Sequence, residues 1–70
     1  MSKTTTTATT RSDALRSLEA LRSLIRSSHG RMSKPRVSLA LHDCDLAFIE
    51  ICRGNFDTAI EICEHRTFNL

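Results

Sequence analysis

The segment from Val37 to His65 places the strongest constraint on the fold of this chain. It contains two apolar runs that each end in Ile-Glu-Ile-Cys, separated by Arg53-Gly54-Asn55-Phe56. Gly54 and Asn55 both tolerate positive φ, so they suit a tight turn. Apolar residues recur at helical spacing on both sides of this turn. The segment therefore predicts a helix, a tight turn and another helix, with Asn55 as the N-cap of the latter.

An earlier helix is predicted over residues 12–29. Its apolar stripe follows the spacing i, i+4, i+7, i+11 and consists of Ala14, Leu18, Leu21 and Ile25. Ser12 is the expected N-cap, and Gly30 is expected to end the helix in the left-handed conformation. Ser33, followed by Pro35 in the first turn, marks the start of the next helix. Because the connection is short, the two flanking helices should be antiparallel neighbours.

The predicted fold class is all-α. An antiparallel hairpin of helices 12–29 and 34–53 is followed by a short third helix at 56–66, in a single domain spanning residues 12–70. Residues 1–11 are predicted to be a disordered, threonine-rich tail. Threonine is β-branched and forms helices poorly, and this stretch has too little apolar surface for burial to offset the entropy lost on ordering.

The helix predicted at 34–53 is apolar on two sides. One stripe contains Val37, Leu41, Cys44, Phe48 and Ile51, and another side carries Leu39, Leu46 and Ile49. A helix that is apolar on two sides is normally covered on both. About sixty folded residues make a marginal core, and such chains often associate. We therefore predict a homodimer whose self-association residues are Leu39, Phe48, Ile49 and Ile51.

The net charge of +2 conceals a strong asymmetry. Residues 1–36 carry eight Lys or Arg and two Asp or Glu, whereas residues 37–70 carry two Arg and six Asp or Glu. This asymmetry either attracts an acidic partner to the first half or pairs the two halves with each other. The residues predicted to bind a partner are Arg16, Arg22, Arg26, Arg31, Lys34 and Arg36. Arg22 and Arg26 share a helix face, whereas Arg16 lies off it.

The three cysteines favour a reducing compartment. Three thiols cannot all pair within one chain, and no apolar run resembles a signal peptide or a membrane span. We therefore expect a cytoplasmic protein with free thiols that are mostly buried.

Neither a metal site nor an active site is predicted. His42-x-Cys44 and Cys63-x-His65 supply two Cys and two His, but side chains two residues apart on a helix point about 200° apart. A cysteine nucleophile needs a lowered pKa and a base within reach. Cys44 lies between Asp43 and Asp45, whose negative charges are expected to raise the pKa of its thiol. No cofactor is expected, and the chain is not predicted to be an enzyme.

Residues 37–65 resemble a single tetratricopeptide hairpin at its central turn. That family places Gly, a polar residue, an aromatic and, three positions later, a small Ala, which here are Gly54, Asn55, Phe56 and Ala59. The resemblance implies that Ala59 allows close approach of the two helices while Phe56 fills the space beside it. The family's Trp-Leu-Gly opening and its closing Pro are absent, and the chain has one unit where about three are needed for a stable stack. The resemblance therefore implies the geometry of the hairpin and not the family's peptide-binding groove.

In overall form the chain is similar to small phage-encoded host-takeover proteins. The shared features are a tiny helical chain, a threonine-rich start, no catalytic motif and a surface suited to dimerisation. The similarity implies a non-catalytic protein-interaction module that inhibits or modulates a host regulatory protein. Such proteins include anti-activators of quorum-sensing transcription factors and inhibitors of pilus-assembly ATPases. The alternative is a small DNA-binding transcriptional regulator that uses the basic N-terminal half.

Overall fold

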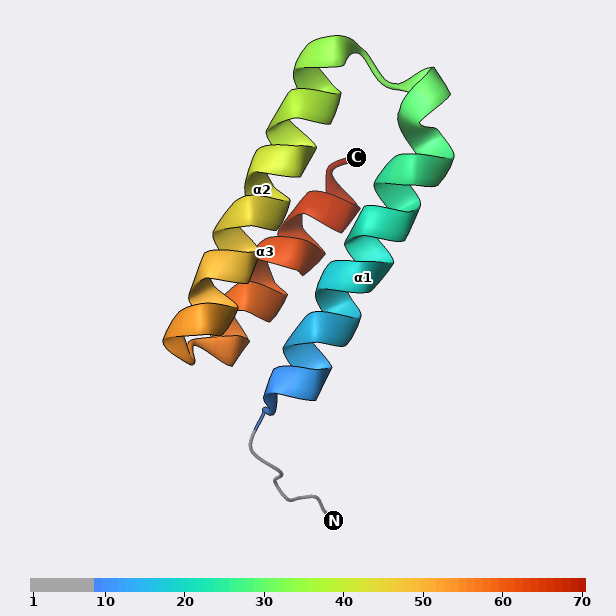
Figure 1. Ribbon diagram of the computed structural model, residues 1–70. Helices are drawn as coiled ribbons and strands as arrows, with labels where there is room; N and C mark the ends of the chain where they lie inside the picture. Colours follow the sequence, from blue (N-terminus) through green and yellow to red (C-terminus); the bar gives the residue numbers. More distant parts are fainter. Residues whose placement is uncertain (1–8) are drawn as a thin grey trace.

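Residues 9–70 form three α-helices that pack against one another (Figure 1). The computed structural model describes residues 9–70. In order, the elements are α1 (Arg11–Ser28), the short 3-10 helix η2 (His29–Arg31), α2 (Lys34–Arg53) and α3 (Phe56–Phe68). Helix α2 runs antiparallel to α1, and α3 returns in the direction of α1. The residues described contain no strand, so the all-α prediction is confirmed, and α3 extends two residues beyond the predicted end.

The N-cap of α1 is Thr10, not the predicted Ser12. The Thr10 hydroxyl accepts a hydrogen bond from the backbone N–H of Asp13 at 3.2 Å, and the Asp13 carboxylate accepts one from the backbone N–H of Thr10 at 3.0 Å. This reciprocal pair is a capping box. The hydrogen bonds from Thr10 lower the pKa of the Asp13 carboxyl. The cap brings Arg11 into the helix, and residues 1–8 of the predicted tail lie outside the described residues.

The turn between α2 and α3 is made at Gly54, which adopts the positive φ expected of a glycine at this position. Gly54 has φ of 86° and a left-handed conformation, which a side chain would strain. Its N–H donates to the carbonyl of Ile51 at 3.0 Å, and the N–H of Asn55 donates to that of Glu50 at 2.8 Å. Asn55 occupies the N-cap position of α3, but its side chain donates to the Glu50 carboxylate at 2.7 Å and does not cap the helix.

Gly30 does not adopt the predicted left-handed conformation. It lies inside η2, where the N–H of Met32 closes the turn onto the carbonyl of His29 at 3.4 Å. The chain therefore continues from α1 into a 3-10 turn and then becomes extended at Met32, so this connection needs no residue with positive φ.

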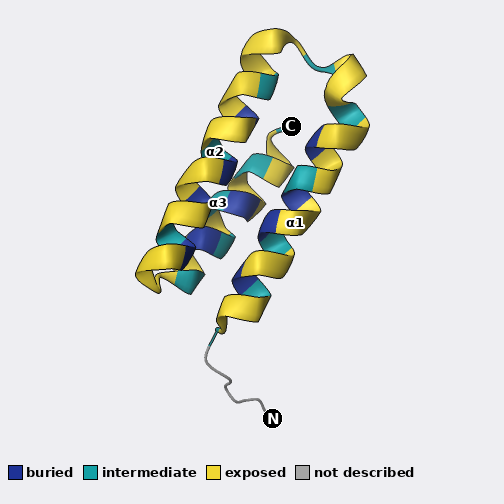
Figure 2. Cartoon of the chain, in the orientation of Figure 1, coloured by how far each residue is buried: buried dark blue, intermediate teal, exposed yellow. Residues whose placement is uncertain are grey.

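The buried face of α2 differs from the predicted stripe. Ala40, Cys44, Ala47 and Ile51 are buried, whereas Leu41 and Phe48 are 49% and 46% exposed. Figure 2 shows the buried positions of all three helices facing one another. Because α2 packs against both α1 and α3, three of its four buried side chains are small and allow close helix approach, while Ile51 is buried and the other large side chains lie on the flanks. The complete buried core is Ala14, Leu18, Leu21, Ile25, Ala40, Cys44, Ala47, Ile51, Ala59 and Cys63.

A nearly buried ion pair joins α2 to α3. The Nε of Arg66 lies 2.6 Å from the Oδ2 of Asp43, and each side chain is only 15% exposed. Nearby, Arg36 donates to the backbone carbonyl of Leu70 at 3.2 Å. Both contacts hold the C-terminal end of α3 against α2.

Asp43→Ala should lower the free energy of unfolding by about 2–3 kcal/mol, because it leaves the Arg66 guanidinium poorly solvated and without its partner. The matched control is Asp45→Ala, which removes an exposed carboxylate two residues away on the same helix and should change stability by less than about 0.5 kcal/mol. Urea denaturation followed by circular dichroism measures both. Equal effects of the two substitutions would contradict a stabilising role for the pair.

Candidate protein-binding surfaces

A groove with cationic and apolar walls lies between α1 and α2. From α1 it is lined by Arg22, Ile25 and Arg26, from the start of η2 by His29, and from α2 by Leu41. The first four residues follow the helical spacing i, i+3, i+4, i+7. Its volume is about 270 Å³. Ile25 is buried and Leu41 is half exposed, so the apolar part of the wall is continuous with the core.

The two arginines of the groove differ in their contacts. Arg22 lies 3.7 Å from the Glu19 carboxylate and is partly buried. Within residues 9–70, Arg26 forms no ion pair. No acidic side chain lines the groove, so its charge is positive.

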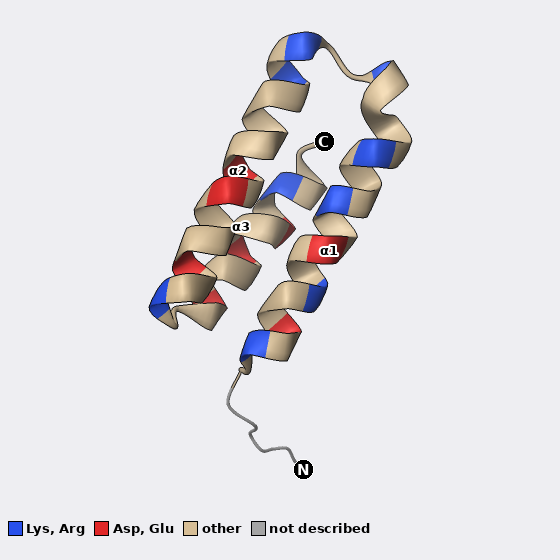
Figure 3. Ribbon diagram, in the orientation of Figure 1, with Lys and Arg blue, Asp and Glu red and all other residues tan. Residues whose placement is uncertain are grey.

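The other four cations predicted to bind a partner do not join this groove. Arg16 pairs with Asp13 at 3.9 Å on the solvent side of α1, with 80% of its side chain exposed. Arg31 lies in η2, Lys34 begins α2, and Arg36 contacts the end of the chain. Figure 3 shows Lys and Arg distributed along α1 and the adjoining end of α2, whereas acidic residues concentrate on α2 and α3. The structure thus brings together two of the six predicted residues.

Sequence reasoning missed two residues of the groove. His29 lies seven residues after Arg22 and four after Ile25, so helical spacing alone could have placed it on their face. Leu41 had been assigned to the buried stripe of α2, and it lines the groove because the helix presents smaller residues to the core.

The outer surface of α2 is unusually apolar. Five large hydrophobic side chains on this helix are between 39% and 49% exposed, namely Leu39, Leu41, Leu46, Phe48 and Ile49. Three of them were predicted self-association residues. The fourth prediction, Ile51, is wrong because this side chain is only 2% exposed and belongs to the core, where it cannot reach another chain.

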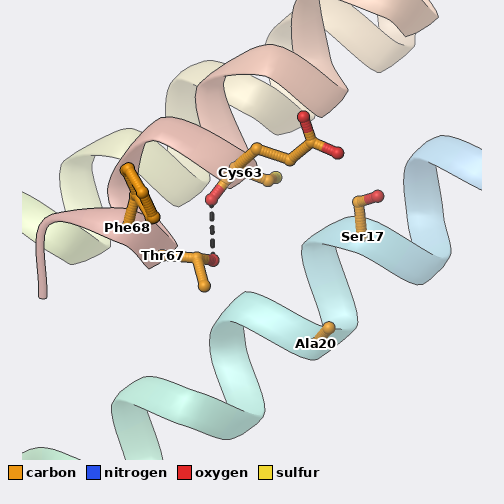
Figure 4. Close-up of a pocket in the computed structure, with 6 residues that line it drawn as sticks. Ser17, Ala20, Cys63, Thr67 and Phe68 are labelled. Carbon is orange, nitrogen blue, oxygen red and sulfur yellow. Dashed lines mark hydrogen bonds between the residues drawn. The ribbon is translucent and has the colours of Figure 1, made fainter.

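A smaller hollow of about 190 Å³ lies between α1 and α3 (Figure 4). Ser17 and Ala20 line it from α1, opposite Cys63 and Thr67 of α3. The Thr67 hydroxyl donates to the Cys63 carbonyl at 2.8 Å, which satisfies the hydroxyl within its own helix. Phe68, at the end of α3, is 93% exposed beside this hollow.

The environments of the buried cysteines disfavour thiolate chemistry. Burial raises the pKa of the Cys44 thiol, and the Arg22 guanidinium opposes this effect only in part. Burial, reinforced by the neighbouring Cys44, raises the pKa of Cys63 to about 11. Cys52 is exposed.

In each of the two Cys and His pairs considered as metal ligands, the cysteine is buried and the histidine is exposed. Cys44 and Cys63 lie in the core, whereas His42 and His65 are exposed. In the part of the chain that the structure describes, no three side chains among His, Cys, Asp and Glu come together as a metal-binding group.

Comparisons of the chain with models of known protein families, with curated proteins and with solved structures found no match. None of the helices formed by residues 9–70 is both long and apolar enough to span a membrane.

In the folded chain, a thiol reagent such as DTNB at mildly alkaline pH should modify Cys52 rapidly and Cys44 and Cys63 slowly. A raised pKa lowers the thiolate fraction at a given pH, and burial restricts access to the sulfur. Absorbance after mixing should show one fast thiol, and all three should react in denaturant. The variant Cys52→Ser should lose the fast phase. Its persistence in that variant would contradict the burial of the other two thiols.

Proposed function

We propose that this chain is a non-catalytic, cytoplasmic binding module that forms a homodimer and inhibits or modulates a regulatory protein. The observation that carries this proposal is the set of five half-exposed hydrophobic side chains on α2. Scattered apolar residues are normal on a surface, but a group concentrated on one helix is typical of an interaction site.

Helical register divides the five side chains into two groups. Leu39, Leu46 and Ile49 fall within a sector of about 80° on the outward side of α2. Leu41 and Phe48 are seven residues apart and share the other flank, next to α1. His42 and Arg53 share this sector, and Asp45 lies about 40° beyond Ile49, so the charges border the apolar group, whose middle suits a self-complementary contact between two copies of α2.

The proposed target is a host regulatory protein, either a transcription factor or a pilus-assembly ATPase. Support comes from the overall similarity to small host-takeover proteins and from the cationic groove. The DNA-binding alternative is weaker, because Arg16 lies about 120° around α1 from Arg22, and Arg36 is engaged with Leu70. Phosphate binding needs cations gathered on one face.

The homodimer is tested by Ile49→Asp. A buried carboxylate would disfavour the contact between the two α2 helices, so the dimer dissociation constant should rise by about tenfold or more. Sedimentation equilibrium over a range of micromolar concentrations measures this constant. Ser23→Asp adds the same charge to an exposed position of α1 and should leave the constant unchanged. A wild-type chain that is folded and monomeric throughout this range would contradict the dimer.

The type of target is tested by capture from nuclease-treated host lysate, followed by mass spectrometry. A protein partner should be retained after nuclease treatment and enriched over a tag-only control. Reconstitution with the purified partner should then inhibit its activity. Loss of all binding on nuclease treatment, with a mobility shift of DNA that weakens steeply with salt, would favour the DNA-binding alternative.

A further inference from the structure

We propose that the groove between α1 and α2 binds an acidic, amphipathic helical segment of the partner protein. This inference rests on the proposed function, since it assigns the contact site of the binding module. The segment is expected to carry a Glu or Asp side chain that meets Arg22 and Arg26, and a neighbouring apolar side chain that meets Leu41.

The charge of the groove supports a carboxylate as the polar ligand. Arg26 has no acidic partner within residues 9–70. Arg22 has only Glu19, whose side chain is 72% exposed, at 3.7 Å. An exposed pair of this kind contributes little free energy and can exchange for a better ligand. Both guanidinium groups are therefore free to donate hydrogen bonds to a carboxylate from outside.

The position of the two arginines supports binding of one carboxylate by both. They are one helical turn apart on α1, and both line the groove that Leu41 borders from α2.

The apolar wall supports a protein segment over a nucleic acid. Leu41 offers a hydrophobic surface beside the two cations, and no Phe, Tyr or Trp lines the groove, so the His29 imidazole is the one ring in its lining on which a base could stack. Its volume of about 270 Å³ suits a few side chains of a helix that lies along the α1–α2 interface. An acidic residue and an apolar residue one turn apart on such a helix would meet both parts of the wall.

A pair of stapled helical peptides tests this proposal with the full-length protein. One peptide carries Leu and Glu one turn apart, and the other has Lys in place of each Glu. Fluorescence anisotropy should show that the acidic peptide binds about tenfold more tightly than the basic one, as expected when opposite charges meet across an interface. Amide chemical shifts in a ¹⁵N spectrum should change between Arg22 and His29 and around Leu41.

Arg26→Glu should weaken binding of the acidic peptide by about tenfold, since it places a carboxylate where the ligand's own carboxylate would lie. The matched control is Arg16→Glu, which makes the same charge change on α1 outside the groove. It should alter the affinity by about twofold at most, through long-range charge alone. Circular dichroism of both variants establishes that they are folded.

Several results would overturn the groove assignment. These are equal affinity for the two peptides, equal effects of the two variants, shift changes confined to α3, or a change of oligomeric state in Arg26→Glu. The last result would assign the groove to contact between copies of this chain. If Arg26→Glu still captures the partner from lysate, the binding module stands and only the groove assignment fails. If the wild-type chain captures no protein, the proposed function itself fails.

Discussion

The packing of α2 against two helices at once is the constraint on which the rest of the structure depends. Ala40, Ala47 and Cys44 form most of its inward face, and their small side chains let α1 and α3 come close. Cysteine behaves here as a small hydrophobic residue, which is consistent with the raised pKa of its thiol. These small side chains allow close packing but add little buried apolar volume to the core. Most of the larger apolar side chains of α2 are left on its flanks, where they are nearly half exposed.

The sequence predicted the helices well because their ends depend on neighbouring residues. Ser33 and the following proline set the start of α2, and Gly54 sets its end. The cap of α1 was misplaced by two residues, although the signal was present. Thr10 is followed three positions later by an acid, and only that spacing forms the reciprocal hydrogen bonds observed. Gly30 was misread because a glycine after a helix can also lie within a 3-10 turn.

The inward face of α2 could not be predicted from the sequence alone. A helix with apolar residues on most sides offers several stripes, and the choice depends on the distance of approach of the neighbouring helices, which is a tertiary property. The stripe with the largest residues therefore appeared to be the core, and Leu41 was assigned to it. The shared face of Arg22 and Arg26 could be predicted, because it depends only on helical spacing. The apolar wall opposite them could not, because it depends on how α2 packs against α1.

The two proposed contacts use different sides of α2. Leu39, Leu46 and Ile49 point outward, whereas Leu41 lies against α1 and forms part of the groove. A dimer formed through the outward side therefore leaves both grooves open, and a symmetric pair presents two identical cationic sites. When the target is itself a dimer or a larger assembly, the second contact becomes intramolecular and the overall affinity exceeds that of one groove. Such a gain requires that the spacing of the acidic segments on the target match the spacing of the two grooves, which would make the binding selective for assembled targets.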